Sequence, residues 1–422
     1  MSKKNIKLRP WVKIVIALII LAALFFIGKL VYGWLDLGDH DYFEGSKCTE
    51  DCVMEIDPEV EAALAEFTNE LYNAERKTPG PFTVSEYDQN KIDRAIPDMS
   101  DLFKNPTGEA AERWRTSLTY LITARALSGR DLKIDNIAFD FTYQSIEPGD
   151  DSYKVTYLES ASYEFACLDG LVSESYNMPC EMTFAKTKKG WKVTDYYRED
   201  DFTLAVDGMM EITPSSEKVL NKLLKSYRKN MKERQKLQDK HVDYSDVKYD
   251  VAFDRDAALE YAKKWVKERN SEDWDVYDEL GGNCQNFGSQ VIYAGGIPMD
   301  CEGDAIWKYF DSALDTSSSK TGRSASWTGA PYFRAYAKAN KGFGLVATVD
   351  ANLYTAEPGD ILQVGARKGE VSHTNVVIGT IAQDDKVIDI LINSNTNNRI
   401  NWPISASLSG NYSLIKIHGY NK

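Results

Sequence analysis

The chain has 422 residues, which is too long for one ordinary domain and predicts two globular units with additional segments. Hydrophobic residues make up 43 % of it and charged residues 27 %, a globular balance that excludes a largely disordered protein. The formal net charge of −14 argues against a dominant basic face, so we expect no nucleic-acid partner.

The N-terminal residues predict a membrane anchor. Residues 1–13 form a basic tail without acidic residues, and residues 14–35 are apolar apart from Lys29. About 20 apolar residues span a bilayer, and the basic tail predicts a cytoplasmic N-terminus with an extracytoplasmic C-terminus. A cleaved signal peptide is the alternative, but no small-residue cleavage site follows the apolar run. We therefore expect a single-pass protein of the cell membrane, with residues 14–35 in the lipid.

The cysteines allow several disulfides in an oxidising compartment. Residues 36–56 form an acidic linker that contains the closely spaced Cys48 and Cys52. Cys167 and Cys180 flank a predicted strand connection and form a second candidate pair. A third bridge, between Cys284 and Cys301, is an open alternative that would remove any catalytic thiol at residue 284.

Residues 57–212 are predicted to form an extracytoplasmic α+β domain. Apolar residues recur at helical spacing over 57–76 and 108–129, and alternating patterns then predict antiparallel strands with a hairpin turn at "KTKKGW". Helices followed by such a meander are faintly similar to the cone-shaped SnoaL-like fold. The region contains no clustered acids, histidines or metal ligands, so a spacer or a protein-binding module is the default. Residues 213–245, mostly a charged helix, predict a connector to the last domain, residues 246–422.

The stretch "LGGNCQNFGSQVIYAGGIPMD" predicts a cysteine mounted at the start of a helix. Gly281 and Gly282 allow a tight turn, Asn283 is suited to cap a helix, and the apolar residues after Cys284 keep a helical period until Gly295. The unpaired N–H groups and the dipole at a helix start favour a thiolate. Cysteine is also a common small core residue, so the helix alone does not establish a nucleophile.

A nucleophilic cysteine needs a base, and His373 is the best candidate among four histidines. It begins a predicted strand, and this strand and the next read as a hairpin that turns at "AQDDK". If Ile381 faces Val387, then His373 faces Asn395, close enough for the amide oxygen to accept the imidazole N–H. A register shifted by one residue would break this pairing, so Asn393 on the same face is the reserve.

Residues 249–418 resemble the putative amidase domain family, within the wider class of papain-like cell-wall cysteine peptidases that includes the CHAP and NlpC groups. The matching motifs occur in the family's order: "YDVAFDRDAALEYAKKW", "GGNCQNFGSQVIYAGGIPM", "SWTGAPYFRAYAK", "EPGDILQV", "SHTNVVIGT" and "NTNNRINWPIS". The resemblance implies an α+β, papain-like fold for residues 246–422. It also implies a Cys nucleophile, a His base and a polar third residue, which fall on Cys284, His373 and Asn395. No cofactor or metal is implied.

The chemistry expected from these residues is acyl transfer through a thioester. The backbone N–H of Cys284 would bind the oxyanion, with Asn283 or Gln285 as the second donor. Trp327, like Trp307 and Trp402, is either a wall of the cleft or a core residue.

Three functions fit this reading. The first is a membrane-anchored extracytoplasmic cysteine amidase or peptidase acting on cell-wall peptidoglycan. The second is an inactive amidase-like scaffold or binding module, motivated by Asn283 and Asn395, where the family commonly has aspartate and histidine, and by the 284–301 bridge. The third is a transpeptidase or deamidase that uses the same three residues.

Overall fold

The computed structural model describes residues 56–82, 88–365, 369–408 and 410–422. None of the helices in these ranges combines the length and the apolar character that crossing a bilayer requires. The predicted tail, anchor and acidic linker, together with Cys48 and Cys52, lie outside the described residues.

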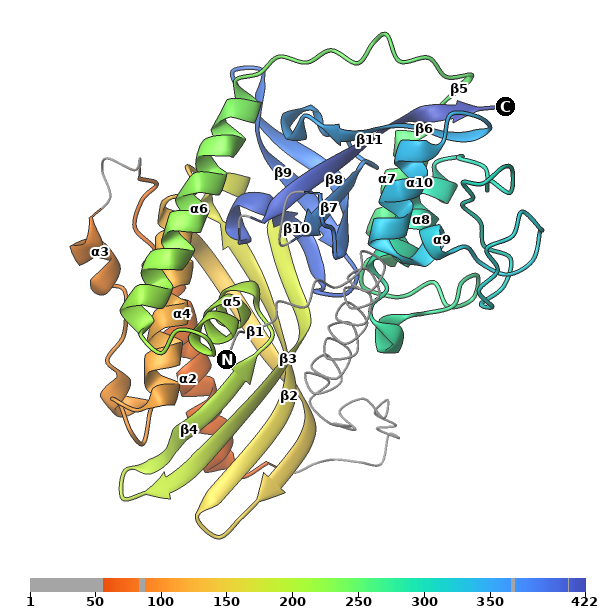
Figure 1. Ribbon diagram of the computed structural model, residues 1–422. Coiled ribbons are helices and arrows are strands. Elements are labelled where there is room, and N and C mark those ends of the chain that lie inside the picture. The colour runs from red at the N-terminus through yellow and green to blue at the C-terminus, as the bar shows by residue number, and fades with distance from the viewer. Residues whose placement is uncertain (1–55, 83–87, 366–368, 409) are drawn as a thin grey trace, which may run out of the picture. The chain divides into compact units, whose positions relative to one another are not determined.

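The N-terminal region, residues 56–212, packs helices against antiparallel strands (Figure 1). The helices are α2 (Pro58–Arg76), α3 (Gln89–Asp93), α4 (Glu109–Ala126) and α5 (Asp201–Met210), with a short 3-10 turn η1 (Met99–Asp101). The strands are β1 (Ile134–Pro148), β2 (Ser152–Phe165), β3 (Val172–Thr187) and β4 (Gly190–Arg198), with the turn η2 (Ala166–Leu168) between β2 and β3. Side chains along β2 alternate in burial because one face covers the core. The α+β prediction is confirmed here, whereas the SnoaL-like resemblance stays a prediction.

The predicted disulfide between Cys167 and Cys180 is wrong, because both cysteines are free. Cys167 lies in the turn η2, but β3 begins at Val172 and carries Cys180 at mid-strand, opposite Tyr157 of β2. A disulfide requires Cα atoms closer than about 7 Å, and eight residues of extended chain exceed that several-fold. Cys284 and Cys301 are also free, so the alternative 284–301 bridge is not formed.

The connector is α6 (Ser216–Gln238), which leads into the C-terminal region, residues 246–422. This region contains the helices α7 (Arg255–Trp265), α8 (Cys284–Ala294), α9 (Ala325–Thr328) and α10 (Ala330–Ala339) and the short turns η3 (Asp278–Leu280), η4 (Leu353–Thr355) and η5 (Ile404–Ala406). Its strands are β5 (Val251–Ala252), β6 (Gly344–Ala351), β7 (Ile361–Gly365), β8 (His373–Gln383), β9 (Lys386–Ser394), β10 (Arg399–Pro403) and β11 (Asn411–Asn421). The helices lie beside the strands in Figure 1, as an α+β fold requires.

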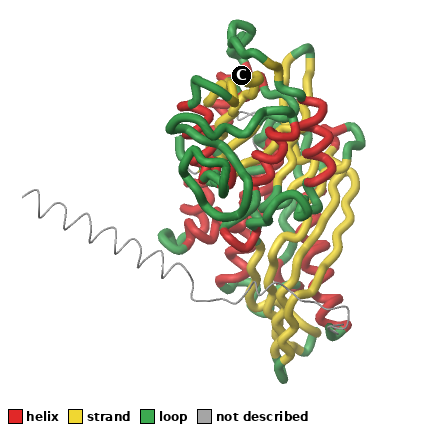
Figure 2. The backbone as a smooth tube through the Cα atoms, turned by 90° about the vertical axis from the view of Figure 1, so that its right-hand side faces the viewer, coloured by secondary structure: helices red, strands yellow, loops and turns green. Residues whose placement is uncertain are grey.

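The strands of both regions belong to one sheet. In the described residues the order is β1-β2-β3-β10-β9-β8-β7-β11-β5, with β4 added to β3 and β6 added to β11. The two regions join where β10 pairs antiparallel with β3, Arg399 opposite Ser175 and Ile400 opposite Glu174. Figure 2 shows strands running through both regions, and residues 54–422 form one compact unit.

The aromatic core of the C-terminal region is built on the polar side of α8. Trp327 stacks between Trp274 and Trp307, with ring centroids 5.1 and 4.8 Å away. Its indole N–H donates to Asn286, and that of Trp307 donates to Ser289. Trp307 and Trp327 have no exposed surface, so Trp327 is a core residue and its assignment to a cleft wall is wrong.

Gly295, the predicted end of the cysteine helix, is confirmed as the residue after α8. A Cβ atom at this position would lie 2.0 Å from the ring of Phe253, so Gly295→Ala should lower the free energy of unfolding by about 1–3 kcal/mol through overpacking. Gly208, inside α5, is the matched control, because a Cβ there meets nothing within 4 Å and alanine should stabilise by up to about 1 kcal/mol. Urea unfolding of both variants measures the difference; equal stabilities would contradict the packing at Phe253.

Candidate active site

The loop before α8 presents Cys284 at the first position of the helix. Gly281 and Gly282 have φ angles of +99° and +112°, a left-handed backbone that glycine adopts without strain. The amide N–H of Asn283 donates to the hydroxyl of Thr396 at 2.7 Å, which fixes the end of the loop. Cys284 is 8 % exposed, and the first N–H groups of a helix have no intrahelical partner. The glycine turn and the helix start that the sequence predicts around Cys284 are therefore present.

The side chains of Asn283 and Gln285, the predicted second oxyanion donors, are buried and hydrogen-bonded within the protein. Asn283 makes no side-chain cap bond: its oxygen accepts from the amide of Tyr277, and its amide donates to Asn395 at 3.0 Å. Gln285 is fully buried, and its amide nitrogen donates to Ser289 at 3.2 Å. Both amides therefore make hydrogen bonds inside the protein. The backbone N–H at the start of α8 remains the donor candidate.

His373 begins β8 and hydrogen-bonds to the thiol of Cys284. Its Nε2 lies 2.8 Å from the hydroxyl of Ser394 and 3.1 Å from the amide oxygen of Asn375. Both partners are acceptors: the Ser394 hydroxyl donates to the carbonyl of Thr396, and the Asn375 amide nitrogen donates to that of Leu362. Nε2 therefore carries a hydrogen, which leaves Nδ1 for the sulfur.

The predicted orienting residue, Asn395, is wrong because the hairpin register differs by one residue. The turn is two residues long, with positive φ at Asp384 and Asp385, and it pairs Gln383 with Lys386 and Val376 with Asn393. This register brings Ser394 to the imidazole.

Asn395 instead accepts a hydrogen bond from Asn283 and donates to the carbonyl of Val266 at 2.7 Å. The reserve, Asn393, is also committed elsewhere, since it contacts the carbonyl of Ala262 and the amide of Asn401. Both asparagines therefore bond to groups other than the histidine.

The pKa values of Cys284 and His373 are shifted toward an ion pair. Burial would raise the pKa of the Cys284 thiol, but the charge and hydrogen bond of His373, with the N–H groups of Thr374 and Gln285, lower it below its ordinary value of 9.0. Burial would lower the pKa of His373, but Cys284, followed by Asp201 and Asn375, raises it above 6.5. Both shifts favour a thiolate beside an imidazolium, and such a thiolate can attack an electrophilic carbon.

The comparisons with known proteins are consistent with this arrangement. Residues 252–420 match the family model described as a putative amidase domain. This part of the chain is similar to that family. The family match therefore supports an amidase-like function, hydrolysis of amide bonds. The chain is also 28 % identical over 148 residues to the uncharacterized protein YhbB of Bacillus subtilis, a match that covers 32 % of this chain and 43 % of YhbB. The chain therefore spans less than half of that relative, and no solved structure matches it.

Ser394 gives a direct test of how the amidase domain orients its histidine. Ser394→Ala removes one of the two acceptors at Nε2, so we expect kcat/KM for amide hydrolysis to fall about tenfold, equivalent to about 1.4 kcal/mol of transition-state stabilisation. Ser372→Ala, which removes an exposed hydroxyl next to His373, is the control and should leave the rate unchanged. Equal rates for both variants would show that Ser394 does not orient the imidazole.

Proposed function

We propose that this protein is a membrane-anchored, extracytoplasmic cysteine amidase that hydrolyses amide bonds in cell-wall peptidoglycan. The observation that carries the cysteine mechanism is the hydrogen-bonded pair of Cys284 and His373, with the imidazole held from behind by Ser394 and Asn375. The family match supports chemistry on amide bonds. The apolar stretch 14–35, with its basic flank, supports the anchor.

Acylation begins with the thiolate of Cys284. Its sulfur attacks the carbonyl carbon of the scissile amide, and the carbonyl oxygen becomes an oxyanion that the backbone N–H at the start of α8 can bind. The imidazolium of His373 then gives its Nδ1 proton to the departing nitrogen as the C–N bond breaks. The products of this step are a free amine and a thioester on Cys284.

Deacylation uses the same imidazole as a base. Neutral His373 takes a proton from water, the resulting hydroxide-like oxygen attacks the thioester carbon, and the C–S bond breaks. A carboxylic acid leaves, while the thiolate and imidazolium are regenerated. Ser394 and Asn375 accept from Nε2–H throughout, so the ring keeps its orientation while Nδ1 gains and loses the proton.

The peptidoglycan substrate rests on the predicted location and on the wider class of wall peptidases that the motifs resemble. We also propose that the amidase domain has the papain-like arrangement, because α8 carries the cysteine and the sheet carries the histidine. Both statements extend beyond the family match.

The test is digestion of purified peptidoglycan by the full-length protein in detergent. New amino groups should appear as amide bonds break and should accompany the release of soluble muropeptides, and simple peptides should show whether the wall is required. Release of muropeptides without new amino groups would contradict amide hydrolysis, and cleavage of simple peptides alone would contradict the wall substrate.

A further inference from the structure

The N-terminal region reaches the active site through the junction of β3 and β10. Besides the strand pairing, the Ser173 hydroxyl donates to the carbonyl of Asn401 at 2.7 Å, and the Asn401 amide donates to the carbonyl of Val172 at 3.0 Å. These bonds hold β10 against the first residues of β3, and the loop of residues 395–398 leads directly into β10. That loop directly follows Ser394, which contacts the catalytic histidine.

Tyr176 is a buried residue of β3 that contacts the amidase domain. It is 3 % exposed, and its hydroxyl donates to the carbonyl of Val266, just after α7. The same hydroxyl accepts from Arg269 at 3.4 Å. The side chain therefore makes its polar contacts outside the region of the chain to which it belongs.

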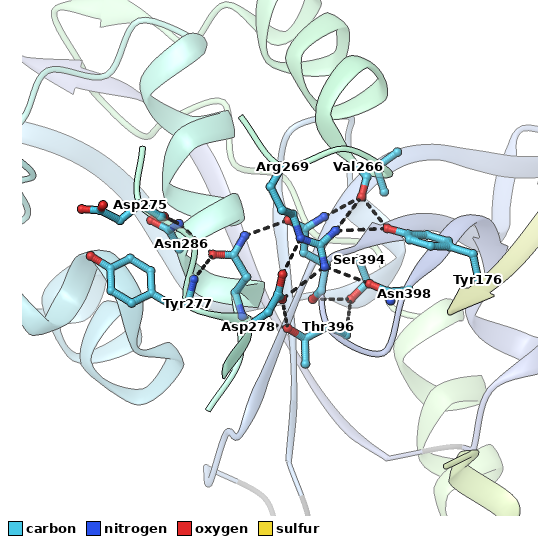
Figure 3. A network of polar contacts seen from close by, with 12 residues as sticks. Tyr176, Val266, Arg269, Asp275, Tyr277, Asp278, Asn286, Ser394, Thr396 and Asn398 are labelled. Atoms are coloured by element: carbon cyan, nitrogen blue, oxygen red, sulfur yellow. Dashed lines mark hydrogen bonds and ion pairs between the residues drawn. The ribbon is translucent and has the colours of Figure 1, made fainter. Parts of the chain in front are cut away.

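Arg269 bridges the two loops that carry the catalytic machinery (Figure 3). Its Nε and one terminal nitrogen donate to the two carboxylate oxygens of Asp278 at 2.8 and 3.2 Å. That nitrogen also reaches the amide oxygen of Asn398 at 3.1 Å. Asp278 lies six residues before Cys284, and Asn398 lies four residues after Ser394. One guanidinium thus holds both sides of the site.

Thr396 connects these two loops to each other. Its hydroxyl accepts from the amide of Asn283 and donates to Asp278 at 3.3 Å, while its carbonyl accepts from Ser394 at 2.9 Å. A continuous series of hydrogen bonds therefore joins Tyr176 and Arg269 to Asn283, the residue before Cys284. The same series reaches Ser394, which accepts a hydrogen bond from His373. Figure 3 shows the Arg269, Asp278 and Thr396 part of this network.

We propose that Arg269 is a positioning residue for Cys284 and His373, and that docking of the N-terminal region through Tyr176 completes the active site. The inference rests on the proposed cysteine mechanism. A planar guanidinium can bind a carboxylate in bidentate fashion and still donate to further acceptors, whereas a lysine ammonium cannot match that geometry. Small displacements of reacting groups cost rate without necessarily weakening substrate binding.

The experiment uses the full-length protein with three substitutions: Arg269→Lys, Tyr176→Phe and the control Arg334→Lys. Arg334 is buried to a similar degree, with a side chain 12 % exposed against 16 % for Arg269, and it pairs with Asp350 of β6. Two readouts are taken for each: kcat and KM for peptidoglycan hydrolysis, and the pH dependence of Cys284 alkylation by iodoacetamide.

For Arg269→Lys we expect a fall in kcat of about 10- to 100-fold with KM changed less than threefold, and an alkylation profile shifted to higher pH. Tyr176→Phe should move both readouts in the same direction by a smaller factor. Arg334→Lys should match the wild type in both. A purely structural role for Arg269 predicts a lower Tm with an unshifted alkylation profile in the folded protein, and that result would overturn the proposal, as would wild-type kcat in Arg269→Lys. If the wild type hydrolyses no amide, the proposed function fails, but the alkylation profiles still test the positioning.

Discussion

Cys284→Ala is expected to abolish amide hydrolysis while leaving the protein folded. In the proposed mechanism the sulfur forms the acyl intermediate, and loss of such a nucleophile typically lowers kcat by about 10⁴-fold or more. The change removes only one small, nearly buried atom at the start of α8, and the helix keeps its other contacts. The measurement is the release of muropeptides and of new amino groups from purified peptidoglycan.

Cys301→Ala is the matched control for that experiment. Cys301 is a second free cysteine of the amidase domain, but it is half-buried in the loop after α8 and its pKa is raised, chiefly by burial. We expect the rate of this variant to equal that of the wild type. Hydrolysis by Cys284→Ala at the wild-type rate would refute the cysteine mechanism.

His373→Gln should lower the reactivity of the Cys284 thiol at mildly acidic pH. Burial is the largest influence on the thiol and raises its pKa; the charge and hydrogen bond of His373 are the main forces that oppose it. Without the imidazole, the pKa of Cys284 should therefore rise, and at pH 6 the thiolate fraction and the rate of alkylation by iodoacetamide should fall more than about tenfold. Hydrolysis should fall further, because the variant also lacks a proton donor for the leaving group.

The sign of the pH dependence follows from the directions of the two shifts. As pH rises, Cys284 ionises below its ordinary value of 9.0, and His373 loses its proton only above its ordinary 6.5. Alkylation should rise as Cys284 ionises, while hydrolysis, which needs the imidazolium as acid, should fall as His373 loses its proton. His418→Gln is the control: His418 bonds to Thr348, and burial lowers its pKa to about 4. An unchanged alkylation profile in His373→Gln would contradict the ion pair.

Local signals in the sequence predicted the turn and the helix start that hold Cys284. The two glycines, the helix that starts at Cys284 and its end at Gly295 depend on backbone angles and on helical periodicity, which short stretches encode. The polar partners of α8 were less visible. Asn286 and Ser289 look like solvent-facing residues in the sequence, but they are buried and satisfy the indoles of Trp327 and Trp307.

The partners of His373 depended on a register that composition does not fix. The hairpin turns at Asp384 and Asp385 and pairs Val376 with Asn393 instead of Ile392. This one-residue difference turns Asn395 away and brings Ser394 to the face of the imidazole. Asn375 had a simpler signal, because residues two apart in a strand share a face, so the residue two after the histidine was a candidate from the strand period alone.

The contribution of the N-terminal region to the site had no local signal. Ser175 and Arg399 pair across β3 and β10 although more than 200 residues separate them, and neither strand is marked by its sequence as an open edge. Arg269 likewise has no local signal: it follows α7, which ends at Trp265, and it reaches Asp278 and Asn398. Such contacts follow from tertiary packing, which residue patterns do not report.

A difference titration measures directly whether Cys284 is an ionised sulfur beside His373. The ultraviolet absorbance of the thiolate is followed against pH in the wild type and in Cys284→Ser, and the difference isolates this one sulfur. We expect the thiolate signal to appear below pH 9.0. The same titration in His373→Gln should move to higher pH. A thiolate that forms only at or above pH 9.0, or at the same pH with and without the histidine, would contradict it.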